Sequence, residues 1–254
     1  MFGSLLMIRY DIAYSSVIGE RKEQQDSFEV RTREGVTFAV VCDGLGGHRG
    51  GALASRLAAD MLTKSFEESC PKDIPSFFAE NVRAINDAVY DIRCDDGSRM
   101  GAGTTMVCAV IDSGKLYRMS VGDSRIYLFR DGQLMQLTVD HNYLLVLDNG
   151  LASGRITQEE YDSEYYKGSS LISVLGMDEL VRVDINTKPL ELAGGDVLIL
   201  MSDGLYKALD DDEIAQCLSG DAQSCCDELM RRIEKSKFPL DNTTFIVERI
   251  ITEG

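Results

Sequence analysis

Apolar and polar residues alternate along much of the chain, and this period of two residues predicts many β-strands. We predict strands over residues 7–18, 26–32, 36–42, 104–111, 115–121, 125–130, 133–138, 181–187, 196–201 and 243–251. Turn-forming residues at 112–114 and 130–132 indicate hairpins between neighbouring strands. The three strands from 104 to 130 are therefore predicted to form an antiparallel meander.

Four segments instead repeat their apolar residues at helical spacing. Two long helices are predicted over 52–68 and 75–93, and two shorter ones over 211–219 and 222–236, separated by Gly220. The residues expected to share one face of each long helix are Leu53, Leu57, Met61 and Phe66 in the first, and Phe78, Val82, Ile85, Val89 and Ile92 in the second. Because strands come in groups and helices in pairs, we predict an α+β fold.

The rest of the chain gives no sign of a second domain. No repeat, low-complexity tract or linker rich in Pro, Gly or Ser divides it. Segment 142–170 has weak periodicity and many polar and Tyr residues, which favours an irregular helical insertion. We therefore predict one domain over residues 1–254.

Composition narrows the possible partners. The 254 residues include 26 Lys and Arg against 42 Asp and Glu, which gives a formal net charge of −16. This acidity disfavours nucleic acid and anionic membrane surfaces, because like charges repel. No apolar run approaches the ~18–20 residues of a membrane span, and the first residues make a poor signal peptide. We expect a cytoplasmic protein without membrane insertion.

Cysteine and histidine usage excludes several kinds of site. The seven cysteines form no C-x-x-C pair, and some of them, such as Cys42 and Cys108, lie in apolar runs. This pattern predicts buried free thiols in a reducing compartment. The adjacent Cys225 and Cys226 leave a redox-active pair open as an alternative. Only two histidines occur, which excludes a His-rich zinc site.

Aspartates recur at the ends of predicted strands. Two long apolar strands lead directly into Asp-Gly pairs, at Asp43-Gly44 and Asp203-Gly204. An acid at the mouth of a buried strand is unfavourable unless it is paired or binds a cation. The glycine after it is expected to let the backbone turn sharply and leave its carbonyl free as a ligand. Three further aspartates lie at strand ends or at a hairpin turn: Asp26, Asp123 and Asp241.

This set of acids favours a hard cation. Oxygen ligands without Cys or His select Mg²⁺ or Mn²⁺. A single Asp-Gly pair is also a common turn, so a loop role stays open for each aspartate. That alternative is weakest for Asp43 and Asp203, because each follows a long apolar strand. The glycine-rich segment 43–51 is not a nucleotide-binding loop, since neither G-x-G-x-x-G nor G-K-[S/T] follows the strand.

Eight short segments then follow one another through nearly the whole chain: Arg21-x-x-x-x-Asp26, Asp43-Gly-Leu-Gly-Gly-His48, Gly103-Thr-Thr105, Val121-Gly-Asp-Ser-Arg125, Leu137-Thr-Val-Asp-His141, Leu175-Gly176, Ser202-Asp-Gly-Leu205 and Asp241-Asn-Thr-Thr244. In this order they resemble the metal-dependent type 2C (PPM) Ser/Thr protein phosphatases, bacterial branch. The resemblance implies two antiparallel sheets packed as a sandwich and flanked on both sides by antiparallel helix pairs. It makes residues 1–254 one catalytic domain, with segment 142–170 as a flap.

The resemblance also implies a dinuclear Mn²⁺ or Mg²⁺ site at one end of the sandwich. Carried over by position, Asp43 would bridge both ions and the Gly44 carbonyl would ligate one of them. Asp203 and Asp241 would complete the other. Asp123, together with Asp203, would hold a third and weaker ion.

Other positions would act on the substrate or support the ligands. Arg21 would bind the substrate phosphate, since its fork donates two parallel hydrogen bonds. His48 is the nearest candidate for proton transfer, with a capping or loop-ordering role as the alternative. Gln25 and Asp26 would lie behind the metal ligands, and Gln25 departs from the family, which often has an acid there. The stretch before Leu175 also departs, because the usual Arg and Asn are missing.

The implied activity is hydrolysis of phosphoserine and phosphothreonine by a metal-activated water. Two alternatives stay open: a catalytically weak relative that signals by binding, and another two-metal phosphoesterase. The expected partners are phosphorylated proteins, and a cognate Ser/Thr kinase is a further candidate. We expect a monomer.

Overall fold

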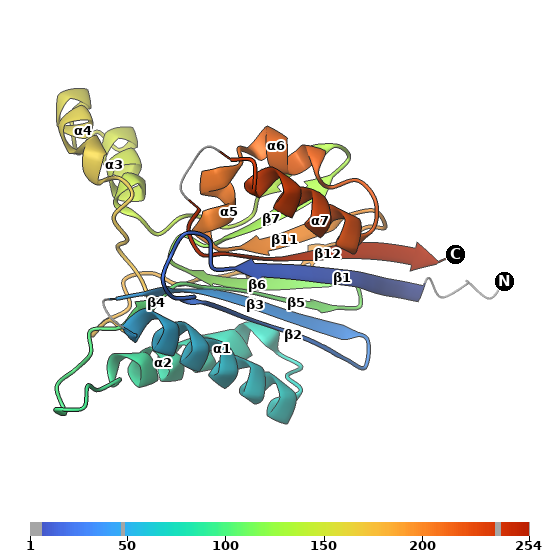
Figure 1. Cartoon of the computed structure of the whole chain (residues 1–254), viewed down its shortest axis with the longest axis horizontal. Helices are drawn as coiled ribbons and strands as arrows, with labels where there is room; N and C mark the ends of the chain where they lie inside the picture. Colours follow the sequence, from blue (N-terminus) through green and yellow to red (C-terminus); the bar gives the residue numbers. More distant parts are fainter. Residues whose placement is uncertain (1–6, 47–48, 237–239, 254) are drawn as a thin grey trace.

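Two antiparallel β-sheets pack face to face in the computed structural model, which describes residues 7–46, 49–236 and 240–253 (Figure 1). The first sheet has the strand order β1 (Met7–Val17), β12 (Thr243–Glu253), β11 (Val197–Met201), β7 (Arg125–Arg130), β8 (Gln133–Gln136). The second has the order β10 (Leu190–Glu191), β6 (Lys115–Val121), β5 (Met106–Asp112), β3 (Val36–Leu45), β2 (Asp26–Arg33). Two short strands, β4 (Gly103–Thr104) and β9 (Asp184–Ile185), pair with β3 and β6.

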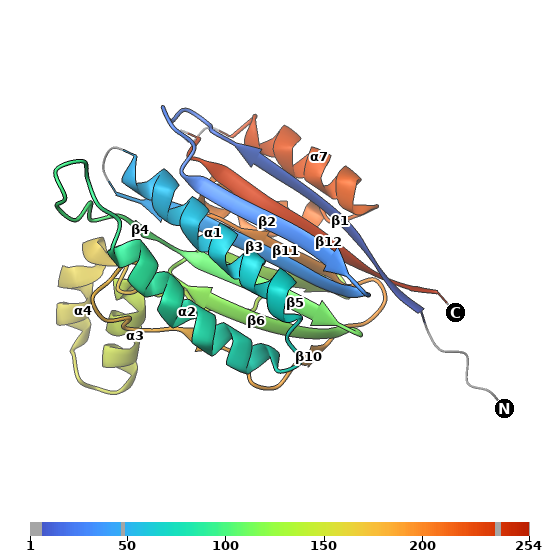
Figure 2. The same ribbon diagram turned by 90° about the horizontal axis from the view of Figure 1, so that it is seen from below.

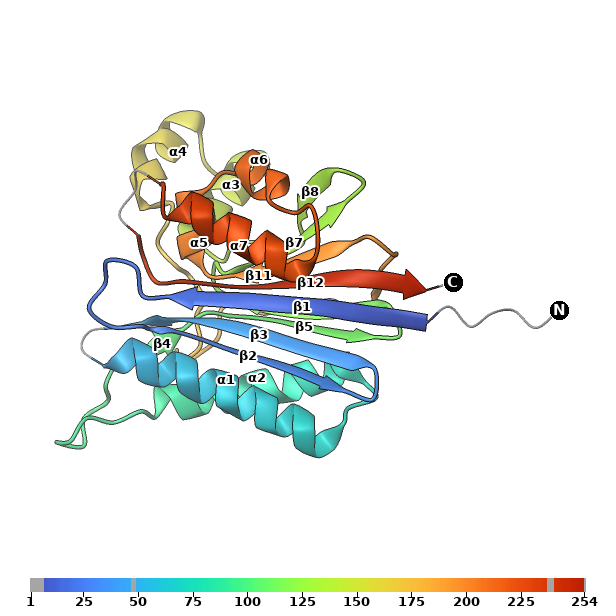
Figure 3. The same cartoon turned by 45° about the vertical axis from the view of Figure 1, so that its right-hand side comes forward.

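Helices cover the outer face of each sheet (Figures 1 to 3). The second sheet carries the hairpin of α1 (Gly50–Ser69) and α2 (Ile74–Tyr90), whereas the first carries α5 (Asp203–Ala208), α6 (Asp211–Gln216) and α7 (Ala222–Ile233). Apolar side chains fill each helix–sheet interface and the space between the sheets. The predicted α+β sandwich with outer helices is confirmed, although one side carries three helices where a pair was expected.

Every predicted strand coincides with a strand of the structure, but the predicted meander is wrong. β5 and β6 form the expected hairpin, as do β7 and β8. β6 and β7, however, belong to different sheets, and β7 pairs with β11. The segment between them is therefore a crossover from one sheet to the other. Gly122 in this crossover has φ +95°, and a Cβ atom there would lie 2.6 Å from the side chain of Thr105.

The four predicted helices are present near their predicted positions, but the buried face of α1 was predicted wrongly. α2 buries Phe78, Val82, Ile85 and Val89 as predicted. α1 leaves Leu53 48% exposed and instead packs a row of small residues, including Ala54 and Ala58, against the sheet. Small side chains let the helix axis approach the sheet closely, which apolar spacing alone does not reveal.

Segment 142–170 forms α3 (Tyr143–Ala152), α4 (Gln158–Glu164) and a short 3₁₀ turn, so its predicted helical character is confirmed. These helices project from one end of the sandwich (Figure 1). Both connections of the projection meet at His141, which is fully buried. Its backbone N–H donates to the Gly122 carbonyl, and its carbonyl accepts the Ile172 N–H, each over 2.9 Å.

The cysteines lie largely where they were expected. Five of the seven are buried, whereas Cys70 is exposed and Cys94 is half-buried, and all are free thiols. Each helix within the described ranges is too short or too polar to cross a lipid bilayer.

Candidate active site

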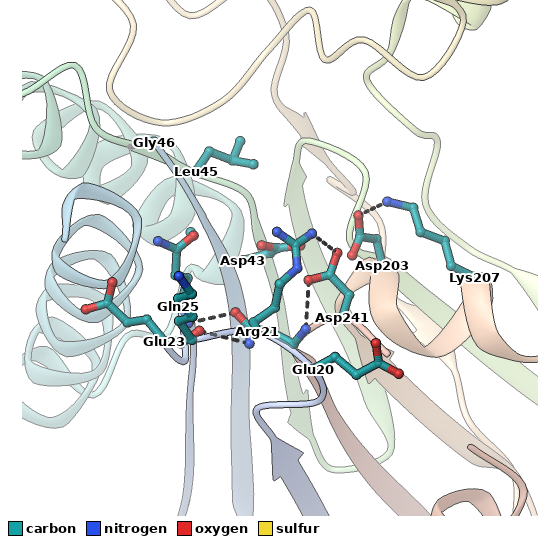
Figure 4. Close-up of a pocket in the computed structure, with 13 residues that line it drawn as sticks. Glu20, Arg21, Glu23, Gln25, Asp43, Leu45, Gly46, Asp203, Lys207 and Asp241 are labelled. Carbon is teal, nitrogen blue, oxygen red and sulfur yellow. Dashed lines mark hydrogen bonds and ion pairs between the residues drawn. The ribbon is translucent and has the colours of Figure 1, made fainter. Parts of the chain in front are cut away.

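A pocket of about 800 Å³ opens at one end of the sandwich, where β3, α5 and the start of β12 meet the loop that precedes β2 (Figure 4). Its lining is rich in charged residues and comprises Glu20, Arg21, Lys22, Glu23, Gln25, Asp43, Gly44, Leu45, Gly46, Asp203, Lys207, Asp241 and Asn242. Four of the five predicted ligand positions thus converge from distant parts of the sequence. The fifth, Asp123, is adjacent and does not line the pocket.

Asp43 is held by its backbone. The Asp43 N–H donates to the Thr105 hydroxyl over 3.0 Å, and the Thr104 hydroxyl donates to the Asp43 carbonyl over 2.9 Å. The same Thr105 hydroxyl lies 2.7 Å from that of Ser124, which belongs to the crossover containing Asp123. The Gly103-Thr-Thr105 segment therefore fixes the position of Asp43 relative to the crossover.

The turn predicted at Gly44 is absent, and glycine is needed there for another reason. β3 continues through Asp43 and Gly44 to Leu45, so the chain does not turn at Gly44. A Cβ atom at Gly44 would lie 2.2 Å from the Gly51 carbonyl oxygen and 2.5 Å from the Gln25 carbonyl oxygen. Glycine is required here because the start of α1 and the loop before β2 press against the strand, and the expectation of a sharp turn was wrong.

Asp203 and Asp241 each carry a cationic partner. Asp203 is the first residue of α5, directly after β11, and its carboxylate pairs with the Lys207 ammonium one turn later. Asp241 precedes β12 and accepts a 2.6 Å bond from Arg21 Nη2 (Figure 4). Arg21, predicted to bind phosphate, thus lies at the pocket with a largely exposed side chain.

The acidic groups strongly affect one another. Burial raises the pKa of Asp43 well above its ordinary value, and the charges of Asp26, Asp203, Asp123 and Asp241 raise it further. Burial likewise raises the pKa of Asp26 to about 7, although its Oδ2 accepts a 2.8 Å bond from the Ser202 hydroxyl.

Asp26 has a second feature that points to a missing partner. Its Oδ1 atom is buried and has no hydrogen-bond partner among the described residues. The strand register places it directly opposite Asp43. A buried carboxylate oxygen beside a second, half-buried carboxylate is unfavourable unless a cation, a proton or an ordered water compensates it.

Asp123 lies in the crossover between the sheets, which corrects its predicted place at a hairpin tip. Burial, followed by the charge of Asp203, raises its pKa to about 6. The Tyr206 hydroxyl donates to the Asp123 carbonyl over 3.1 Å. Arg125 does not neutralise Asp123, because its fork binds Asp140 over 2.7 and 3.0 Å. The side chain of Asp123 is half-buried, less solvated than a hairpin tip would be.

The structure adds two pocket residues that the sequence reasoning missed. Asn242 donates to the carbonyls of Ile18 and Glu23 and accepts the Gln25 N–H over 2.9 Å, which ties the loop bearing Arg21 to the start of β12. Its signal was its place directly after Asp241. The signal for Lys207 was its place four residues after the predicted ligand Asp203, a spacing at which two side chains meet if the segment is helical.

Two other predicted residues have different outcomes. Gln25 lines the pocket, and its backbone carbonyl accepts the Gly44 N–H over 3.0 Å. His48 lies outside the described residues.

The donor set fits a hard divalent cation. In the part of the chain that the structure describes, no three acidic, His or Cys side chains are already gathered as closely as a metal requires. Arg21 and Lys207 are each paired with one of these carboxylates, Asp241 and Asp203 respectively. Asp43, Asp203 and Asp241 still offer carboxylate oxygens around one pocket, with an excess of negative charge.

Comparison with known proteins decides the family. The family model described as "Protein phosphatase 2C" matches residues 15–243. The chain belongs to the protein phosphatase 2C family. It is 30% identical over 241 residues to the protein phosphatase PhpP of Streptococcus pneumoniae, covering 92% of this chain and 95% of that protein. It is also 30% identical over 185 residues to the serine/threonine phosphatase stp of Listeria monocytogenes, covering 71% of each.

Solved structures of phosphatases have the same fold. The serine/threonine phosphatase of S. agalactiae superposes with a TM-score of 0.80 at 26% identity, covering 95% of this chain and 99% of that one. The PstP catalytic domain in complex with two manganese ions superposes with a TM-score of 0.76 at 28% identity, covering 97% and 99%. This member of the protein phosphatase 2C family is therefore a metal-dependent serine/threonine protein phosphatase.

Proposed function

We propose that this phosphatase holds two divalent ions, Mn²⁺ or Mg²⁺, on Asp43, the Gly44 carbonyl, Asp203 and Asp241. The observation that carries the proposal is the convergence of three aspartates from β3, α5 and the start of β12 on one pocket. Burial, and then the charges of the neighbouring acids, raise the pKa of Asp43, and divalent cations would offset those charges. The presence of two manganese ions in the similar PstP catalytic domain supports the number.

When bound, such ions supply an activated water and positive charge for the phosphoryl group. The chain's own residues do the rest. Arg21 exchanges its bond with Asp241 for the substrate phosphate, which its planar fork can grip through two donors. Gln25 and Asp26 orient water in the pocket from behind the ligands, and His48 protonates the leaving oxygen.

Hydrolysis of p-nitrophenyl phosphate tests the metal requirement. EDTA should abolish hydrolysis, and Mn²⁺ should restore it at least as well as Mg²⁺. The bis ester should be hydrolysed far more slowly, because Arg21 recognises a monoester dianion. Full activity in EDTA would contradict the two-ion site, and a preference for the bis ester would favour another two-metal phosphoesterase. No activity under any metal condition would favour a binding module.

The physiological substrates are phosphoserine and phosphothreonine side chains of proteins, and we propose a cognate Ser/Thr kinase as the enzyme that this phosphatase opposes. A cytoplasmic site of action is supported by the seven free thiols.

We further propose that segment 142–170 is a flap of this single catalytic domain and controls access of protein substrates. It stands clear of the sandwich at the pocket end and exposes Tyr165 and Tyr166, the latter 76% exposed (Figure 1). Tyr166→Ala should therefore reduce kcat/KM on a phosphopeptide by about 3- to 10-fold, the loss of one contact of ~1 kcal/mol. Hydrolysis of p-nitrophenyl phosphate should not change, and equal losses on both substrates would indicate a structural role.

A further inference from the structure

Lys207 places a fixed positive charge inside the acidic pocket. It lies on α5, four residues after Asp203, so one helical turn brings its ammonium back onto the Asp203 carboxylate (Figure 4). The side chain of Asp203 is only 15% exposed, and the pair lines the pocket on the α5 side. The Asp203 carboxylate therefore has one cation supplied by the chain itself.

The same ammonium also acts on Asp123. Its charge lowers the pKa of that carboxyl, against the opposite effects of burial and of Asp203. The converse holds as well, because Asp203 and Asp123 both favour the charged form of Lys207. The ammonium thus lies in the field of the two carboxylates that a third ion would need.

Tyr206, the residue before Lys207, ties α5 to the crossover that contains Asp123. Tyr206 donates its hydroxyl to the Asp123 carbonyl, and the Arg125 guanidinium lies 3.7 Å from the centre of the Tyr206 ring. Helix α5 therefore acts on the crossover through two successive residues: Tyr206 positions the backbone of Asp123, and the charge of Lys207 lowers the pKa of the Asp123 carboxyl.

We propose that the Lys207 ammonium takes the place of a third divalent ion between Asp203 and Asp123, so that this phosphatase binds two ions and not three. The inference rests on the proposed two-ion site. A divalent cation bound to Asp123 and Asp203 would be repelled by an ammonium that cannot diffuse away. Lys207 is accordingly a positioning residue, which holds one oxygen of Asp203 and leaves the other for a core ion.

Counting bound metal tests the proposal directly. Chains equilibrated by dialysis in millimolar Mn²⁺ should contain two ions each, measured by atomic emission. Lys207→Asn removes the positive charge and adds an oxygen donor, and it should raise the count to three. The added ion should disappear in the double variant Lys207→Asn/Asp123→Asn, which should return to two.

Lys22→Asn is the matched control. Lys22 lines the same pocket, is exposed, and forms no ion pair with a described residue, so this variant should still bind two ions. Lys207→Gln, neutral and closer in length, replaces Lys207→Asn if the latter does not fold by circular dichroism. Three ions in the wild type, or two in the neutral Lys207 variants, would overturn the proposal. A wild type that binds no Mn²⁺ would instead contradict the two-ion site itself.

Discussion

The protein buries carboxylates in two contrasting places. At the pocket end, Asp43 and Asp26 lie among other acids, and their neighbours Asp203 and Asp241 are paired with exposed cations. In the middle of the sandwich, Glu248 of β12 lies alone between the sheets, fully buried. Its Oε2 accepts one 3.3 Å bond from the Thr37 hydroxyl of β3, and its Oε1 has no hydrogen-bond partner among the described residues.

Glu248 and the pocket acids differ in what can neutralise their negative charge. Burial raises the pKa of Glu248 to about 7, and no charge among the described residues adds to the shift. A proton is therefore sufficient to neutralise it. In the pocket, burial and the charges of several other acids raise the pKa of Asp43, and the pocket opens to solvent, so divalent cations can enter and offset more than one charge. A single buried acid calls for a proton, whereas a cluster of acids at an opening favours metal ions.

The largest expected effect comes from Asp43→Asn. Loss of a proposed metal ligand should weaken Mn²⁺ binding and lower kcat by more than about 100-fold, since even residues behind metal ligands are worth ~10–100-fold. The metal-free variant should nevertheless melt at a higher temperature than the metal-free wild type, because a repelled buried charge is gone. Calorimetry measures Mn²⁺ binding and the melting temperature, and turnover of p-nitrophenyl phosphate measures kcat. Asp131→Asn, at the exposed β7–β8 turn, is the control and should change neither. Normal metal binding would remove Asp43 from the site.

The next largest effect is expected at Arg21, the exposed cation that pairs with Asp241. Arg21→Ala should raise KM for a phosphate monoester by about 10- to 150-fold, because a lost charge-assisted hydrogen bond is worth ~1.5–3 kcal/mol. Arg56→Ala, on the exposed face of α1, provides the control and should leave KM unchanged. A loss confined to kcat would show that Arg21 stabilises the transition state, and an unchanged KM would place it outside the substrate site.

The smallest effect on activity is expected at Glu248. Its folded-state pKa is raised, so the folded protein retains the proton more readily, and stability falls as pH rises from about 4.5 through about 7. Glu248→Gln should be more stable than the wild type by up to about 3 kcal/mol at pH 8, with a much smaller difference near pH 5. Turnover at pH 8 should stay near that of the wild type. Urea unfolding at both pH values measures the difference.

Glu68→Gln serves as the control for this measurement, since Glu68 is an exposed residue of α1. It should show no pH-dependent difference from the wild type. A Glu248→Gln protein less stable than the wild type at pH 8 would mean that the charged carboxylate contributes to the fold, and the contrast with the pocket would no longer hold.

Most of the fold could be predicted because the spacing of apolar residues shows which face of a strand or helix is buried. This spacing does not show which of the two sheets a strand joins. The crossover at Gly122 has the composition of a hairpin turn, and the contacts that distinguish it from a hairpin, with Thr105 and His141, come from distant parts of the chain. Helix α5 was missed because its first two residues, Asp203 and Gly204, were interpreted as a turn after the strand.

The candidate site was predictable to a similar degree. Strand ends indicated Asp43 and Asp203, because a charge after a long apolar run requires an explanation. The contribution of Asn242 depends on contacts across the fold with the loop before β2, and that of Lys207 depends on the charge of Asp123 in the crossover. No local pattern encodes such contacts. The reason for glycine at position 44 is likewise tertiary, the close approach of α1 and the neighbouring loop.

The pairing of β1 with β12 has a consequence for synthesis. The first strand lies along the last one over its whole length, from Met7 opposite Glu253 to Val17 opposite Thr243. The second sheet, by contrast, uses only residues 26 to 191. As the chain leaves the ribosome, that sheet can form early, while β1 waits unpaired for a partner more than 200 residues away. Asp241 arrives with this partner, so the nascent protein gains its catalytic pocket only when its first sheet closes.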